Sequence, residues 1–153
     1  MEKTVSLSDA RWKLARIWFP FAGAIFLLLA VQSIMGMYGD DIQRAFGWAL
    51  PNFLPTIALM ISVFGQDALV DDPEKFVQTR VKARFLKLTC YLSLFYILTF
   101  VIPFVAAPFR SSISPIDAME IANIWLGPIQ SLVVAAIGVL FFTREEKKGA
   151  STD

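Results

Sequence analysis

Four long apolar runs occupy most of this 153-residue chain and constrain its fold more than any other feature. The runs cover residues 17–37, 46–64, 86–106 and 121–142, and apart from Lys87, near the start of the third, they contain no charged residue and no histidine. Each holds about 20 residues, enough for a helix to span a hydrocarbon core of about 30 Å. The sequence therefore predicts an all-α integral membrane four-helix bundle built from two transmembrane hairpins.

The length and composition leave room for one domain. Apolar residues make up 56% of the chain, more than the average soluble domain contains, and the mean hydropathy is +0.59. We expect a single transmembrane domain over residues 1–153, with polar tails at 1–10 and 145–153. The first run is longer than the apolar core of a signal peptide, so we expect it to remain as a membrane helix.

The distribution of basic residues predicts the orientation. All but two of the 14 lysines and arginines lie before the first run, around the loop between the second and third, or after the fourth. Because basic flanking loops are retained in the cytoplasm, both termini and the middle loop should be cytoplasmic. Arg11, Lys13 and Arg16 should reach lipid phosphates just before the first run. The exceptions are Arg44 and Arg110, which fall in loops expected outside.

The middle loop predicts a cytoplasmic extension of the third helix. Residues 71–74 read Asp-Asp-Pro-Glu, a helix start signal, and no further proline occurs before Pro103. On this extension an apolar stripe runs beside a basic one, which suggests a surface for a protein partner or lipid headgroups. Packing of the stripe against the N-terminal segment or the loop explains it equally well. The residues of this predicted surface are Val77, Arg80, Val81, Arg84, Phe85 and Lys87.

The second run is interrupted by two prolines, which remove backbone donors and favour a kink or local unwinding. The two prolines make either a kinked packing helix, the preferred interpretation, or a hinge or substrate-lining break.

Three amides on different runs fall roughly 8–14 Å below the expected outer boundary, at 1.5 Å per residue. We interpret them as one outer-half polar cluster. It serves either as interhelical hydrogen bonding, again the preferred interpretation, or as a hydrated vestibule or ligand pocket. The residues of this cluster and hinge are Gln32, Pro51, Asn52, Pro55, Thr56 and Gln130.

The fourth run carries small residues at helical spacing. Gly127, Ser131, Ala135 and Gly138 form a seam that lets a neighbouring helix approach closely. The neighbour is either the first or second helix of the same chain or another copy in a homo-oligomer.

Residue types exclude several kinds of chemistry. Without histidine, zinc sites with histidine ligands and Ser-His-Asp triads cannot form. Cys90 is the single cysteine, so there is neither an intramolecular disulfide nor a dithiol site, and we interpret it as a packing residue. The sequence gives no indication of a cofactor, a metal or a catalytic group, and the net charge of +1 gives no general attraction to nucleic acid.

The favoured function is therefore non-enzymatic. We expect a small subunit of the bacterial inner membrane that anchors, senses or regulates with a soluble or membrane partner. An oligomeric channel or pore lined by the second helix and the outer-half amides is the first alternative. A lipid-binding or lipid-modifying enzyme is the second. The lack of buried carboxylates argues against a proton-coupled carrier.

Overall fold

The computed structural model describes residues 3–68, 80–106 and 114–142, and these form four long helices and one small β-ribbon. The helices are α1 (Leu7–Ile34), α2 (Ile42–Ala68), α3 (Ala83–Ala106) and α4 (Pro115–Phe142), and a short 3-10 turn, η1 (Gly39–Asp41), precedes α2. Each of the four is long and apolar enough to cross a membrane. Together they indicate a multi-pass membrane protein, in agreement with the four predicted runs.

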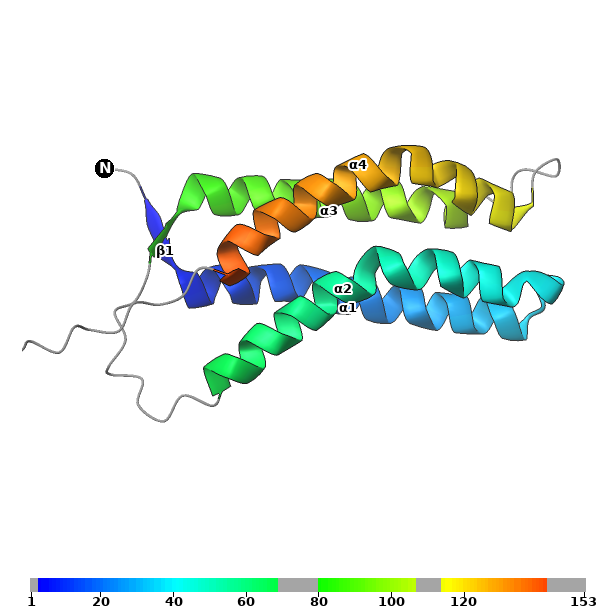
Figure 1. Ribbon diagram of the computed structural model, residues 1–153, viewed down its shortest axis with the longest axis horizontal. Helices are drawn as coiled ribbons and strands as arrows, with labels where there is room; N and C mark the ends of the chain where they lie inside the picture. Colours follow the sequence, from blue (N-terminus) through cyan, green and yellow to red (C-terminus); the bar gives the residue numbers. More distant parts are fainter. Residues whose placement is uncertain (1–2, 69–79, 107–113, 143–153) are drawn as a thin grey trace, which may run out of the picture.

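The helices form two hairpins that pack side by side (Figure 1). α1 lies against α2, α3 lies along α4, and the hairpins meet through α1 with α3 and α2 with α4. The chain turns sharply after α1, where Gly36 takes a φ of +74°. Only glycine adopts this conformation readily, and it lets the chain reverse within a few residues.

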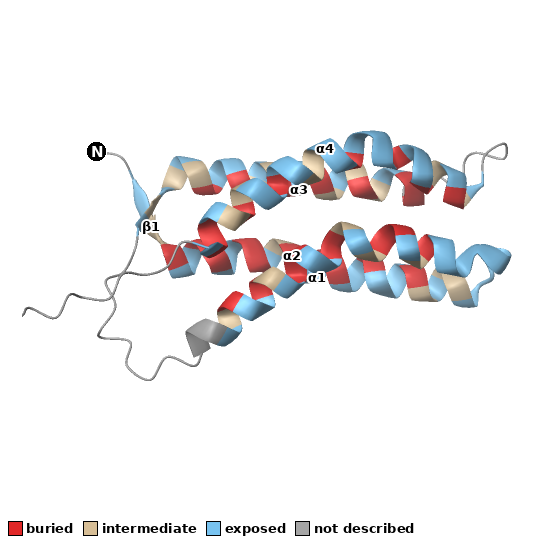
Figure 2. Ribbon diagram, viewed as in Figure 1, coloured by how far each residue is buried: buried red, intermediate tan, exposed pale blue. Residues whose placement is uncertain are grey.

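The outer faces of all four helices carry large apolar side chains. Leu27 is 66% exposed, Leu98 68% and Ile124 76%. Figure 2 shows the buried residues facing the interior and the exposed ones covering the outside of the bundle. Contiguous apolar surface of this kind is rare on soluble monomers, and it fits contact with lipid.

Helix α2 bends near its middle, where the sequence has Pro51 and Pro55 (Figure 1). Its helical structure is nevertheless continuous over Ile42–Ala68. The predicted kink is therefore observed without unwinding, and the second half of α2 leaves the direction of the first.

The cytoplasmic extension predicted for the third helix is wrong where the structure describes it. Arg80–Lys82 form strand β2, which pairs antiparallel with β1 (Thr4–Ser6), and α3 begins only at Ala83. The register places Thr4 opposite Lys82 and Ser6 opposite Arg80. The signal at 71–74 lies outside the described residues. The β-ribbon connects the starts of α1 and α3, which helical periodicity in one segment cannot reveal.

The N-terminal tail predicted over 1–10 is also wrong from Thr4 onward. Thr4–Ser6 are in the ribbon, and α1 begins at Leu7, ten residues before the first apolar run. The Ser6 hydroxyl accepts a hydrogen bond from the backbone N–H of Asp9 at 3.1 Å and caps the helix. It is therefore α1, and not α3, that extends well beyond its apolar run beside the ribbon.

Candidate functional site

Two polar side chains from different helices meet at the backbone carbonyl of Asn52 on α2. The Tyr96 hydroxyl of α3 donates to this oxygen at 2.8 Å, and Gln130 Nε2 of α4 donates to it at 3.2 Å. The Asn52 amide itself donates to the carbonyl of Trp48 at 2.6 Å, one turn earlier. Three helices are thus connected at one carbonyl, three residues before Pro55. We call Asn52, Tyr96 and Gln130 the interhelical junction.

A second polar contact between α2 and α4 lies one helical turn before Asn52. Trp48 Nε1 of α2 donates to Asn123 Oδ1 of α4 at 2.9 Å. Like the junction, it uses an amide on α4 and the mid-section of α2. These bonds satisfy polar groups that would be costly to leave unpaired in hydrocarbon.

Of the predicted polar cluster, the structure brings Asn52 and Gln130 together but places Gln32 elsewhere. Gln32 accepts a hydrogen bond from Tyr38 at the turn after α1, away from the junction. Burial raises the pKa of Tyr38 to about 12, so this hydroxyl stays protonated at neutral pH. Of the other predicted members, Thr56 is buried, whereas Pro51 and Pro55 lie on the exposed side of α2. Tyr96, which the sequence analysis missed, takes the place expected for Gln32.

An aromatic core surrounds these polar contacts. Phe100 of α3 lies at its centre, with ring centroids 4.9 Å from Trp48 and 5.5 Å from Phe21. Trp18 of α1 stacks on Tyr96 at 5.8 Å and donates from Nε1 to the Ser93 hydroxyl at 3.2 Å. Rings from α1, α2 and α3 are in mutual contact, so the bundle interior is filled at this level. The aromatic core comprises Trp18, Phe21, Trp48, Phe53, Tyr96, Phe100 and Phe104.

Arg11 occupies a position that the sequence did not predict. Instead of reaching lipid phosphates, it is 5% exposed and donates to the carbonyls of Leu140 at 3.2 Å and Phe141 at 3.4 Å. Its guanidinium carbon also lies 5.9 Å from the centroid of the Phe141 ring. The last carbonyls of a helix have no intrahelical donors and carry its negative dipole end. Arg11 therefore caps the end of α4 and fixes it to the start of α1.

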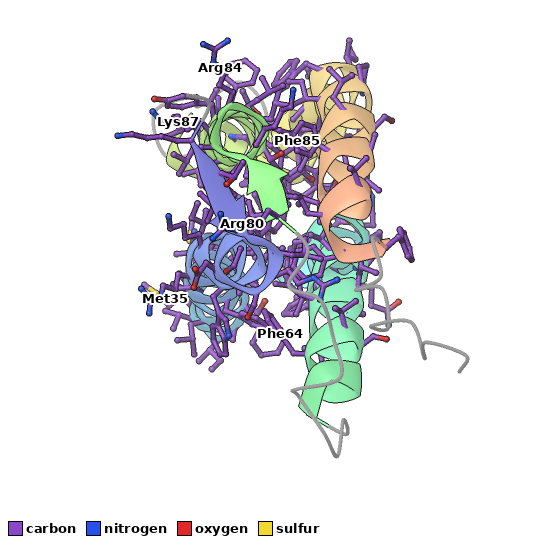
Figure 3. The ribbon with its side chains drawn as sticks, turned by 90° about the vertical axis from the view of Figure 1, so that its left-hand side faces the viewer. Met35, Phe64, Arg80, Arg84, Phe85 and Lys87 are labelled. Carbon is purple, nitrogen blue, oxygen red and sulfur yellow. The ribbon has the colours of Figure 1, made fainter. Side chains whose placement is uncertain are left out.

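The surface predicted on the third helix divides into a packed part and an exposed part. Val81 and Phe85 pack against the hydrophobic core. Arg80, Arg84 and Lys87 are exposed, and Figure 3 shows Arg84 and Lys87 pointing away from the bundle. We call these three cations the basic surface. Val77 lies outside the described residues. Part of the stripe lies against the N-terminal segment, since Val81 pairs with Val5 in the ribbon.

Charges of opposite sign gather at opposite ends of the bundle. The end with the ribbon and the starts of α1 and α3, which we call the basic end, exposes cations from all three. Asp9 is its only exposed acidic side chain among those described. At the other end Arg44 forms ion pairs with Asp41 at 3.2 Å and with Glu120 at 2.5 Å, connecting α2 to α4. The exposed cations of the basic end are Lys3, Lys13, Arg16, Arg80, Lys82, Arg84 and Lys87.

The small-residue seam of α4 lies mostly on the outside. Gly127, Ser131 and Ala135 are exposed, and Gly138 is half-buried beside Phe142. The Ser131 hydroxyl donates to the carbonyl of Gly127 at 3.0 Å, within its own helix. The first three seam residues therefore face lipid or another chain, and the predicted contact with α1 or α2 does not form there.

Among the described residues, no group of histidine, cysteine, aspartate and glutamate side chains is arranged to hold a metal ion.

Comparison with protein-family models, with curated proteins and with solved structures finds no match to this chain.

Proposed function

We propose that this protein is a non-enzymatic membrane subunit that anchors or regulates a soluble partner through the basic surface. The observation that carries the proposal is the gathering of exposed cations at one end, where the ribbon fixes Arg80 close to the start of α1. A rigid, charged platform at the edge of a membrane domain favours electrostatic docking of an acidic surface.

The same distribution supports an orientation. Because lysine and arginine in short flanking segments are retained in the cytoplasm, the basic end should be cytoplasmic. Asp40, Asp41, Asp117 and Glu120 would then lie at the opposite, outer end. Both termini would be inside, and a cytoplasmic partner could reach Arg80, Arg84 and Lys87.

The hydrogen-bond partners of the amide side chains support a role in helix packing rather than in lining a pore. The Gln130 amide donates to the backbone carbonyl of Asn52, which also accepts from Tyr96, so that α2, α3 and α4 are bonded together, and the Asn52 amide donates within α2. A pore lining would instead present its amides to water. We therefore favour the subunit over the oligomeric channel.

Site-specific photo-crosslinking in cells tests the partner. A benzophenone amino acid replaces Arg84 on the basic surface or, as a control, the equally exposed Asp40 at the other end. We expect a discrete adduct with a soluble protein from position 84 and none from position 40. Arg80→Glu should reduce the adduct at least fivefold, since one reversed charge changes the attraction by about 1 kcal/mol or more.

The matched control is Asp117→Lys, which reverses one exposed charge at the opposite end and should leave the adduct unchanged. Adducts from position 84 only to lipid or to other copies of this chain would contradict the proposal. An adduct insensitive to Arg80→Glu would show that the basic surface does not recognise the partner.

A further inference from the structure

We propose that the surface where α1 and α3 meet at the basic end binds the phosphate of an anionic phospholipid. Lys13 of α1 and Lys87 of α3 would bind the phosphate from its two sides. This site shares Lys87 with the basic surface but includes neither Arg80 nor Arg84, and it does not rest on the proposed function. The register of the two helices brings its two lysines together.

The hydrogen bond between Trp18 and Ser93 places α1 and α3 at a common level. Both helices start at the basic end and run in the same direction (Figure 1). Lys13 precedes Trp18 by five residues and Lys87 precedes Ser93 by six, so they lie about 7.5 Å and 9 Å from that level at 1.5 Å per residue. The two ammonium groups therefore come from neighbouring helices at nearly the same depth.

Cys90 shows that the two lysines share one side of the bundle. It is half-buried on α3 and lies within electrostatic range of the Lys13 ammonium on α1. Lys87 is three residues before Cys90, and residues three apart on a helix lie on the same face. Lys13 is thus close enough to Cys90 to act on it electrostatically, and Lys87 lies on the same face of α3 as Cys90.

The surroundings favour a lipid over a free anion. On α3, the surface below Lys87 continues with exposed Tyr91, Leu94 and Leu98, which acyl chains can cover. On α1, Trp12 is 55% exposed and packs in a tilted arrangement against Phe64 of α2, with ring centroids 4.9 Å apart. Tryptophan at such a position favours the headgroup region, so the two lysines lie at headgroup depth.

The local charge also favours an anion. Asp9, one turn before Lys13, is the single exposed acid among the described side chains of this end. Arg16 and Arg84 add positive charge on either side. Juxtamembrane clusters of four or more lysines and arginines attract anionic headgroups, by about 1 kcal/mol for each residue near the surface.

Native mass spectrometry of the full chain in a non-ionic detergent tests the site, with phosphatidylglycerol as the probe and phosphatidylcholine as the neutral reference. We expect the chain to bind phosphatidylglycerol more tightly. Lys13→Gln with Lys87→Gln should weaken this binding about thirtyfold, or about fivefold for each lysine alone. The single variants provide the test if the double variant does not purify as a monodisperse protein.

The matched control is Lys3→Gln with Arg80→Gln, which removes two exposed cations from the ribbon at the same end. It should change the affinity by less than about twofold. An equal loss in both double variants would overturn the proposal in favour of a diffuse positive field, and no loss in either would overturn it outright. Displacement of the lipid by millimolar inorganic phosphate would show that the ligand is a free anion instead.

Discussion

Replacing Arg11 with alanine is expected to lower the free energy of unfolding by about 3 kcal/mol, because it removes charge-assisted hydrogen bonds and leaves helix-end carbonyls buried. The side chain is 5% exposed and donates to the carbonyls of Leu140 and Phe141. No water can replace these donors easily once the site is covered by the Phe141 ring. Reversible denaturation in bicelles, followed by tryptophan fluorescence, measures the change.

The matched control for this prediction is Arg16→Ala. Arg16 lies on the same helix and is exposed, so its loss should cost less than about 0.5 kcal/mol. Arg11→Lys should recover only part of the stability, because an ammonium lacks the planar fork that reaches two carbonyls. Equal effects of Arg11→Ala and Arg16→Ala would show that Arg11 does not cap α4.

Replacing Phe100 with alanine should cost about 4 kcal/mol, which is typical of a large side chain removed from a close-packed core. Its ring is fully buried and contacts aromatic side chains of α1, α2 and α3. Between helices in a bilayer, packing replaces the hydrophobic effect as the main attraction, so a cavity here loosens three helices together.

Phe95→Ala is the control for the core substitution. Phe95 belongs to the same helix but is 53% exposed on the outer face, and its loss should change stability by less than about 1 kcal/mol. Steric trapping of a doubly biotinylated chain measures both variants in bilayer-like conditions. If Phe95→Ala were the more destabilising of the two, the assignment of inner and outer faces of α3 would be wrong.

The four helices could be predicted because long uncharged runs have one stable form in a bilayer. Their ends could not, since α1 begins at Leu7 and α4 at Pro115, in segments that are partly polar. The ribbon is the clearest failure. Thr4–Ser6 pairs with a segment more than 70 residues away, and only tertiary structure can favour strands of three residues each.

The contacts of the polar residues were also only partly predictable from the sequence. Helical depth correctly brought Asn52 and Gln130 to one level, but depth does not specify which way a side chain points. Gln32 therefore bonds to Tyr38, and Tyr96 completes the junction. The sequence predicts Arg11 as a headgroup ligand because arginines beside a membrane run usually reach water. The end of α4, which it caps instead, is distant in sequence and supplies no local signal.

We propose that the basic end of this four-helix membrane bundle lies in the cytoplasm, and cysteine accessibility tests this orientation most directly. In a Cys90→Ala background, one variant carries Asp40→Cys and another Arg84→Cys, both at exposed positions. Intact bacterial cells are treated with a membrane-impermeant maleimide. We expect labelling of Asp40→Cys in intact cells and of Arg84→Cys only after the membrane is permeabilised. Labelling of Arg84→Cys in intact cells, with Asp40→Cys protected, would contradict it.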